Sequence, residues 1–182
     1  MAGHDIVLTY KDYEALPADG RRYEIHDGEI SVTPAPSPQH QMISRNLFRL
    51  LDQHVRRKGI GEVLYAPIDV ILSETSIVQP DLVYLDTARL GAISRRGIEG
   101  APSLVIEVLS PSTTVIDRNT KRQLYARHGV PFYWLVDPEG RAVEGLVLGL
   151  DGYELAARAS GTEPVQIPPF SDLSLVPAAL WP

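Results

Sequence analysis

One carboxylate lies inside a run of residues that is otherwise wholly apolar. Residues 104–109 read Leu-Val-Ile-Glu-Val-Leu, and the charged member of the run is Glu107. A run that is apolar on both faces is typical of a central strand with both sides of its sheet covered. An ionised carboxylate buried in such a strand is costly unless it is paired or binds a metal. Two interpretations follow: Glu107 reaches solvent or a buried arginine at the strand end, or it is a metal ligand.

A second carboxylate directly follows a proline. Asp81 comes after Pro80 within the apolar run 77–85, which we expect to form one strand. A proline in a strand marks an edge or a bulge, and either can re-aim the next side chain. The alternative is an ordinary Pro-Asp turn. If Asp81 and Glu107 lie on neighbouring strands, their carboxylates suit a hard divalent cation whose remaining ligands are waters and substrate oxygens.

The residues after Glu107 predict a helix over 114–128. On this helix Asp117, Lys121 and Tyr125 are spaced four residues apart, so they line one face. Taken alone, this pattern is typical of a solvated stripe of salt-bridged residues. The link from the strand to the helix is short, however. We therefore expect the helix to fold back over the strand end and to bring Lys121 beside Glu107.

Residues of these types can hydrolyse a phosphodiester when they lie together. Two carboxylates can hold Mg²⁺ or Mn²⁺, which acts as a Lewis acid and activates a water molecule. A nearby ammonium group stabilises the negative charge that develops on the phosphate oxygens. We therefore predict Asp81, Glu107 and Lys121 as catalytic residues, with Asp81 and Glu107 as the metal ligands.

Four further residues are secondary candidates for the same site: Asp117 and Tyr125 of the predicted helix, together with Glu24 and His40. Glu24 lies in an alternating run, where an outward-facing glutamate is the simpler interpretation. His40 lies in the first turn of a long predicted helix. It either helps to cap that helix or faces the site as a substrate contact.

The remaining pattern predicts a mixed α/β layer in which helices cover a sheet, as one domain spanning residues 1–182. Asp27-Gly28 predicts a hairpin between two strands, and Ser37 and Gly59 delimit the long helix. The other expected elements are a short helix from Thr9 and strands at 22–26, 29–33, 62–65, 68–72, 103–109, 130–136, 142–148, 153–159 and 165–167.

Composition excludes several classes of protein. The chain has no cysteine, which excludes disulfides, thiolate catalysis and Cys-based zinc sites. No apolar run has the length of a membrane span, and residues 1–17 lack the apolar core of a signal peptide, so we expect a cytoplasmic protein without membrane contact. The net charge of −6 argues mildly against a DNA substrate. A local basic side still forms in segment 40–59, from Arg45, Arg49, Arg56, Arg57 and Lys58.

Several motifs resemble the Uma-type family of restriction endonucleases. They are Gln79-Pro80-Asp81-Leu82-Val83, the segment 102–113 (PSLVIEVLSPST), Asp117 with Lys121 and Tyr125, and the segments 129–138 and 23–29 with His40. The resemblance implies a PD-(D/E)xK nuclease fold, with a central mixed sheet flanked by helices and Mg²⁺ at Asp81 and Glu107. The position two after Glu107 is Leu109 rather than lysine, and the resemblance implies that Lys121 takes that role from the following helix.

Two functions from different classes remain open. The first is a Mg²⁺-dependent endonuclease that hydrolyses DNA. The second is a catalytically inactive nuclease-fold protein that serves as a binding or assembly module, as the negative charge and Leu109 favour. A hydrolase that uses His40 as base is a weaker idea, since no nucleophile elbow accompanies it.

The apolar tail 170–182 either packs on the chain's own core or joins two subunits, and a homodimer would suit cutting both strands of a duplex.

Overall fold

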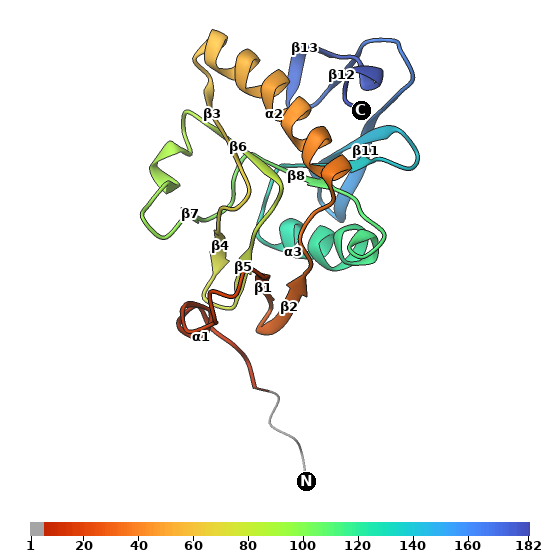
Figure 1. Cartoon of the computed structure of the whole chain (residues 1–182). Helices are drawn as coiled ribbons and strands as arrows, with labels where there is room; N and C mark the ends of the chain where they lie inside the picture. The colour runs from red at the N-terminus through yellow and green to blue at the C-terminus, as the bar shows by residue number, and fades with distance from the viewer. Residues whose placement is uncertain (1–5) are drawn as a thin grey trace.

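The computed structural model describes residues 6–182, and most of its strands belong to two sheets (Figure 1). The predicted mixed α/β class is confirmed. Residues 1–5 lie outside the described residues. They form the first part of segment 1–17, for which we expect no signal peptide. The larger sheet has the spatial order β11 (Gly152–Ser160), β10 (Ala142–Gly149), β9 (Phe132–Asp137), β8 (Leu104–Val108), β6 (Leu82–Asp86) and β3 (Gly61–Tyr65).

Strand β8 lies inside this sheet, parallel to β9 and antiparallel to β6. Its side chains alternate between the two faces: Leu104, Ile106 and Val108 join one apolar core, and Val105 joins the other. Glu107 therefore faces the same side as Val105. On β6, Leu82 pairs with Ile106, so Asp81 immediately before the strand comes opposite Glu107.

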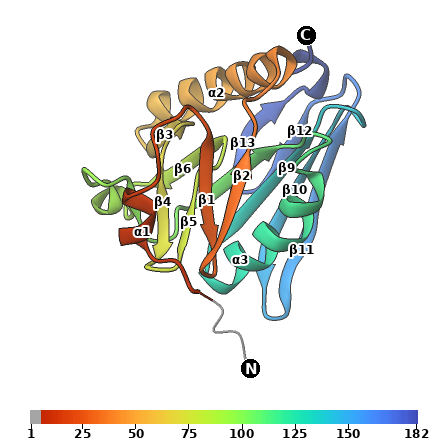
Figure 2. The same ribbon diagram turned by 60° about the horizontal axis from the view of Figure 1, so that its bottom comes forward.

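Helix α2 (Pro38–Lys58) covers one face of the larger sheet, as Figure 2 shows. The helix begins where predicted, because the Ser37 hydroxyl accepts a hydrogen bond from the His40 backbone N–H at 3.2 Å. It ends at Gly59, whose φ of 64° is left-handed. Four apolar side chains of α2 are fully buried against the sheet: Ile43, Leu47, Leu51 and Val55.

The chain's own tail completes this core. β12 (Val165–Ile167) and β13 (Phe170–Leu175) form a hairpin, and η3 (Pro177–Ala179) follows it. Phe170, Leu175 and Leu180 are buried in the same cluster as the α2 side chains. This finding favours the intrachain interpretation of the tail; β13 itself was not predicted as a strand.

A π-helix and a short α-helix cover part of the other face. We predicted one α-helix, but residues Ile116–Lys121 form the π-helix η2, which runs directly into α3 (Arg122–Arg127). Leu124 and Tyr125 pack on Val105 and its neighbours in the second core. Single π-turns are common at functional sites, because they change which side chains point inward.

The smaller sheet lies over the same face, beside η2. Its order is β2 (Glu29–Thr33), β1 (Arg22–His26), β5 (Ser76–Val78), β4 (Val70–Ser73) and β7 (Ile98–Glu99). The predicted hairpin β1–β2 is confirmed: Asp27 and Gly28 have φ of 52° and 88°, as a two-residue primed turn requires. Two short helical elements, α1 (Tyr10–Glu14) and η1 (Leu90–Ala92), complete the described elements.

The prediction of a single strand over 77–85 is wrong. β5 belongs to the smaller sheet and β6 to the larger one, and the chain crosses between them at Gln79 and Pro80. Pro80 has no N–H to offer a ladder, and the N–H of Gln79 donates to Glu24 at 2.7 Å instead. Asp81 therefore lies where the chain passes from one sheet to the other. No helix among residues 6–182 is long and apolar enough to cross a membrane.

Candidate active site

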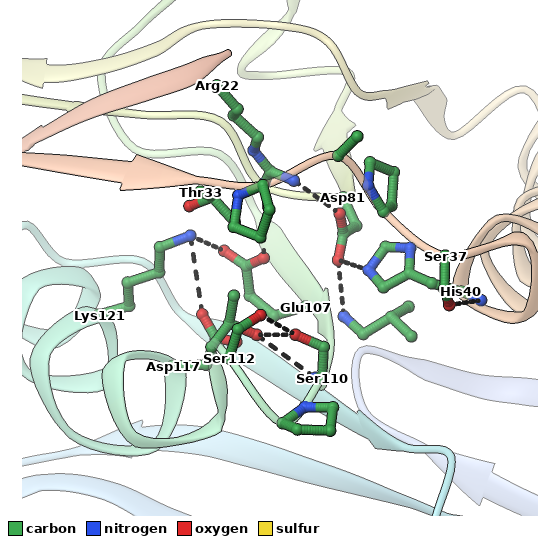
Figure 3. Close-up of a pocket in the computed structure, with 16 residues that line it drawn as sticks. Arg22, Thr33, Ser37, His40, Asp81, Glu107, Ser110, Ser112, Asp117 and Lys121 are labelled. Carbon is green, nitrogen blue, oxygen red and sulfur yellow. Dashed lines mark hydrogen bonds and ion pairs between the residues drawn. The ribbon is translucent and has the colours of Figure 1, made fainter.

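A cavity of about 220 Å³ opens between the β1–β2 hairpin, the start of α2 and helix η2 (Figure 3). Its charged and titratable lining residues come from five separate parts of the chain: Arg22, His40, Asp81, Glu107, Asp117 and Lys121. The structure thus brings together at one cavity five of the seven candidates from the sequence. The other two, Glu24 and Tyr125, hydrogen-bond to cavity residues from behind.

Three donors hold the Asp81 carboxylate. Its Oδ2 accepts from the backbone N–H of Val108 at 2.8 Å and from Nε2 of His40 at 3.0 Å. Its Oδ1 accepts from the Arg22 guanidinium at 3.2 Å. Burial acts to raise the pKa of Asp81, but these neighbours outweigh burial and leave that pKa below its usual value. Asp81 is therefore an anchored, ionised carboxylate, and His40 is a side chain that positions it.

Glu107 lies in a different electrostatic environment from Asp81. Its Oε1 accepts from Tyr125 at 2.8 Å and from the Lys121 ammonium at 3.0 Å. Burial raises the pKa of Glu107 to about 8; Lys121 opposes the rise, and the charges of Asp117 and Asp81 add to it. A further positive charge beside Glu107 would therefore favour its ionised form.

Lys121 is buried among three carboxylates. Its Nζ lies 2.9 Å from Glu24, 3.0 Å from Glu107 and 3.7 Å from Asp117. Burial acts to lower the pKa of Lys121, but the three carboxylates outweigh burial and raise that pKa. Lys121 is therefore a permanent ammonium. The interpretation of its helix face as a solvated stripe is wrong, since Asp117, Lys121 and Tyr125 are at most 4% exposed.

The outward-facing interpretation of Glu24 is also wrong, because this side chain is only 1% exposed. Arg22, Glu24 and His26 share the face of β1 that turns toward the site, while Ile25 packs on the opposite face with the α1 side chains. Besides Lys121, Glu24 binds Nε2 of His26 at 3.2 Å. Despite burial, Lys121 and His26 hold the pKa of Glu24 well below its usual range. Both faces of β1 are buried, which alternation alone does not predict.

Arg22 was missed by the sequence analysis. Its guanidinium lies 3.2 Å from Asp81, 3.9 Å from Glu24 and 4.0 Å from Glu107, so it bridges the two predicted metal ligands. Its Nε has no hydrogen-bond partner among the residues that the structure describes. The signal was its position two residues before Glu24, which places both side chains on one face of β1.

The donor set fits a divalent cation. Four buried carboxyl groups, those of Glu24, Asp81, Glu107 and Asp117, surround the buried Lys121 and the partly buried Arg22. Burial raises the pKa of Asp117, as it does for Glu107, and the carboxyl groups outnumber the cations that oppose the rise. A hard cation with oxygen ligands would favour their ionised forms. Within residues 6–182 no three His, Cys, Asp or Glu side chains are arranged as a ready-made metal cluster. The Asp81–Glu107 pair would therefore share the ion with waters and substrate oxygens.

The chain belongs to the Uma2 family, which is described as "Putative restriction endonuclease"; its family model matches residues 10–178. A comparison with curated proteins finds no match. Among solved structures, the chain is similar to "a putative nuclease belonging to DUF820 from Anabaena variabilis". The two chains are 20% identical, with a TM-score of 0.79 over 95% of this chain and 97% of that chain. This likeness confirms the predicted restriction-endonuclease-like fold. The family match confirms the predicted resemblance to the Uma-type family.

Proposed function

We propose that this protein is a Mg²⁺- or Mn²⁺-dependent endonuclease that hydrolyses phosphodiester bonds in DNA. One observation carries the proposal: Asp81, immediately before β6, lies opposite Glu107 of the neighbouring strand β8 at a cavity, with the Lys121 ammonium 3.0 Å from Glu107. The family membership supports a nuclease, while the metal, the residue roles and the substrate are our inference.

In this proposal Asp81 and Glu107 hold the cation. When bound, the cation supplies Lewis acidity at the phosphate and activates a water molecule. Lys121 donates toward the charge that develops on the phosphate oxygens, and its buried position strengthens that interaction. The Arg22 guanidinium neutralises the phosphate and holds Asp81 in place, and Tyr125 fixes the rotamer of Glu107.

The buried environment also determines the protonation of these groups. Lys121 cannot serve as a general base, because its carboxylate neighbours raise its pKa. Its role is therefore electrostatic. Glu24 holds the ammonium at 2.9 Å and does not line the cavity, which makes Glu24 a positioning residue rather than a catalytic residue.

The decisive experiment measures nicking of plasmid DNA by purified protein with Mg²⁺ or Mn²⁺. We expect Glu107→Gln to reduce the rate by about 10³-fold or more, because a bound metal contributes several kcal/mol to transition-state stabilisation. The matched control is Glu139→Gln, which neutralises an exposed glutamate in a turn. Nicking that survives Glu107→Gln would contradict the mechanism.

The ion pairs that Lys121 already makes favour a second function, that of a catalytically inactive binding or assembly module. The Lys121 ammonium is already bound by Glu24 and Glu107, as expected of a structural ion cluster in an inactive binding or assembly module. Calorimetry with Mn²⁺ separates the two functions: binding that is lost in Asp81→Asn supports the endonuclease, and absence of binding supports the module.

The homodimer stays a prediction. The apolar tail that suggested a subunit contact is used within the chain, where Phe170 and Leu180 are buried. A symmetric dimer would still place two sites on a duplex, one for each strand. Light scattering of the purified protein, with and without DNA, measures the number of subunits directly.

A further inference from the structure

A second cavity, of about 350 Å³, adjoins the site on its α2 side. It shares His40 and Asp81 with the first cavity, and its other walls come from α2 and from the end of β3. Its volume lies in the range of small-molecule sites, roughly 300–1,000 Å³. The residues that distinguish it are Arg45, Phe48, Arg49 and Tyr65.

Two aromatic rings form one wall of this cavity. Phe48 and Tyr65 pack edge to face, with ring centroids 4.7 Å apart. Tyr65 ends the edge strand β3, and it is 61% exposed, whereas Tyr125 and Tyr133 of the second core are fully buried. Phe48 holds the Tyr65 ring from one side and leaves the rest of that ring free to stack on a planar group.

Two arginines stand beside the rings. Arg45 and Arg49 are exposed and one helical turn apart on α2. Among residues 6–182 neither has a carboxylate within ion-pair distance, whereas Arg56 on the same helix pairs with Asp52 at 2.6 Å. Within the described part of the chain, the Arg45 guanidinium bonds only to the neighbouring Asn46 side chain. In a chain with a net charge of −6, two unpaired guanidinium groups next to aromatic rings are complementary to an anionic, aromatic ligand.

We propose that this cavity binds a nucleotide adjacent to the scissile phosphate, with its base stacked on Tyr65 and its phosphates near Arg45 and Arg49. The proposal rests on the proposed nuclease function and names its substrate class. A base inside a duplex has both faces stacked on its neighbours, so it cannot stack on a protein ring. The cavity therefore selects single-stranded or locally unpaired nucleic acid over a fully paired duplex.

The test is binding in the presence of a chelator, so that no strand is cut. The probe is a short single-stranded DNA that contains 2-aminopurine, whose fluorescence is quenched when it stacks on an aromatic ring; the same sequence in a duplex is the comparison. We expect wild-type protein to quench the single strand and to bind it more tightly than the duplex. Tyr65→Leu should lose the quenching and weaken binding about tenfold, as removal of one base–aromatic stack does. Tyr65→Phe should retain both properties.

Matched arginine variants give a second, independent readout. Arg49→Ala and Arg57→Ala each remove one exposed charge from α2, but only Arg49 lines the cavity. We expect Arg49→Ala alone to reduce the salt dependence of binding by about one phosphate contact. Equal effects of the two variants would overturn the proposal.

Other outcomes also overturn it: no quenching by wild-type protein, tighter binding of the duplex, or wild-type quenching by Tyr65→Leu. The outcome is separable from that of the proposed function. Quenching that depends on Tyr65 in a protein that does not nick DNA would support the nucleotide cavity and contradict the nuclease. Nicking by a protein in which Tyr65→Leu changes nothing would do the reverse.

Discussion

The two faces of the larger sheet differ in one respect: both hold an apolar core, but only one also holds a cluster of buried charges. On the α2 face, Leu104, Ile106 and Val108 of β8 pack in a core built from apolar side chains. On the other face the same strand presents Glu107, which lies among Asp81, Asp117, Arg22 and Lys121. Apolar burial thus stabilises both faces, and the second face in addition requires that each buried charge finds a partner.

This difference explains why β8 tolerates a glutamate. The apolar face pays no desolvation cost, and its residues contribute about 1.5–3 kcal/mol each when fully buried. The charge cluster on the other face depends on ion pairs whose attraction is largely cancelled by desolvation. The two apolar cores therefore supply the stability that lets this face hold an excess of carboxyl groups. Four changes to single groups test that division.

The largest effect on stability is expected from Lys121→Met. The substitution leaves Glu24 and Glu107 buried without their shared cation, and breaking a buried pair in this way costs about 3–5 kcal/mol. Urea unfolding measures the loss. The double variant Lys121→Met with Glu24→Gln should recover part of it, because one unpaired charge is then removed; Lys11→Met, at an exposed lysine, is the control. Equal stability of Lys121→Met and wild type would contradict the charged-face account.

Leu47→Ala tests the apolar face. Leu47 is fully buried under α2, and removal of such a side chain costs about 2–5 kcal/mol through lost burial and a residual cavity. Because Leu47 belongs to the apolar core under α2 and does not line the candidate site, Mn²⁺ affinity of the folded protein should be unchanged. Leu150→Ala, at a fully exposed leucine, should change stability by less than about 0.5 kcal/mol. A loss of metal affinity in Leu47→Ala would show that the two faces are coupled.

The pH dependence of Mn²⁺ binding tests Glu107 itself. Its pKa of about 8 means that the metal-free folded protein holds a proton there at neutral pH. The stability from this raised pKa is complete below the unfolded value and is lost as pH rises through about 8. A cation must displace the proton, so affinity should rise about tenfold per pH unit from about pH 6 and level off near 8.

Calorimetry across this pH range measures the slope, and the stabilisation by Mn²⁺ in thermal unfolding should grow in parallel. Glu107→Gln has no proton to displace, so it should lose both the binding and its pH dependence. An affinity that stays constant between pH 6 and about 8 would show that Glu107 is already ionised in the folded protein.

The smallest effect is expected from Tyr125→Phe. It deletes the hydroxyl that donates to Glu107 at 2.8 Å, and loss of a hydrogen bond to a charged or partly charged group costs about 1–3 kcal/mol. Tyr133→Phe is the matched control, since its hydroxyl donates to the backbone carbonyl of Asp117 at 3.0 Å. Only Tyr125→Phe should shift the pH profile of Mn²⁺ binding to higher pH, because only this substitution removes a hydrogen-bond donor from Glu107. A shift of equal size in Tyr133→Phe would contradict this role.

Structural elements that are determined by residues close together in the chain could be predicted from the sequence. The β1–β2 hairpin follows from Asp27-Gly28, which fits the positive φ of the turn, and α2 begins and ends at its predicted capping residues. The buried strand around Glu107 followed from its unbroken apolar run. For the same reason, Asp81, Glu107 and Lys121 could be named, because motif and spacing are properties of the chain itself.

Features that depend on what packs against a segment could not be predicted. The break at Pro80 depends on the second sheet that receives β5, and the π-helix depends on contacts that favour Asp117 and Lys121 pointing inward. Glu24 looked like an outward-facing residue, because alternation does not show whether the polar face of a strand is covered.

By itself, then, the sequence determined the family, the local elements and the identity of the central acidic residues. The tertiary structure decided how these charges are compensated. It folds the β1–β2 hairpin over β8, which adds Arg22 to the site and buries Glu24 against Lys121. The physical reason is that hydrogen bonding and steric preference act between near neighbours, whereas burial and electrostatic pairing depend on residues far apart in the chain.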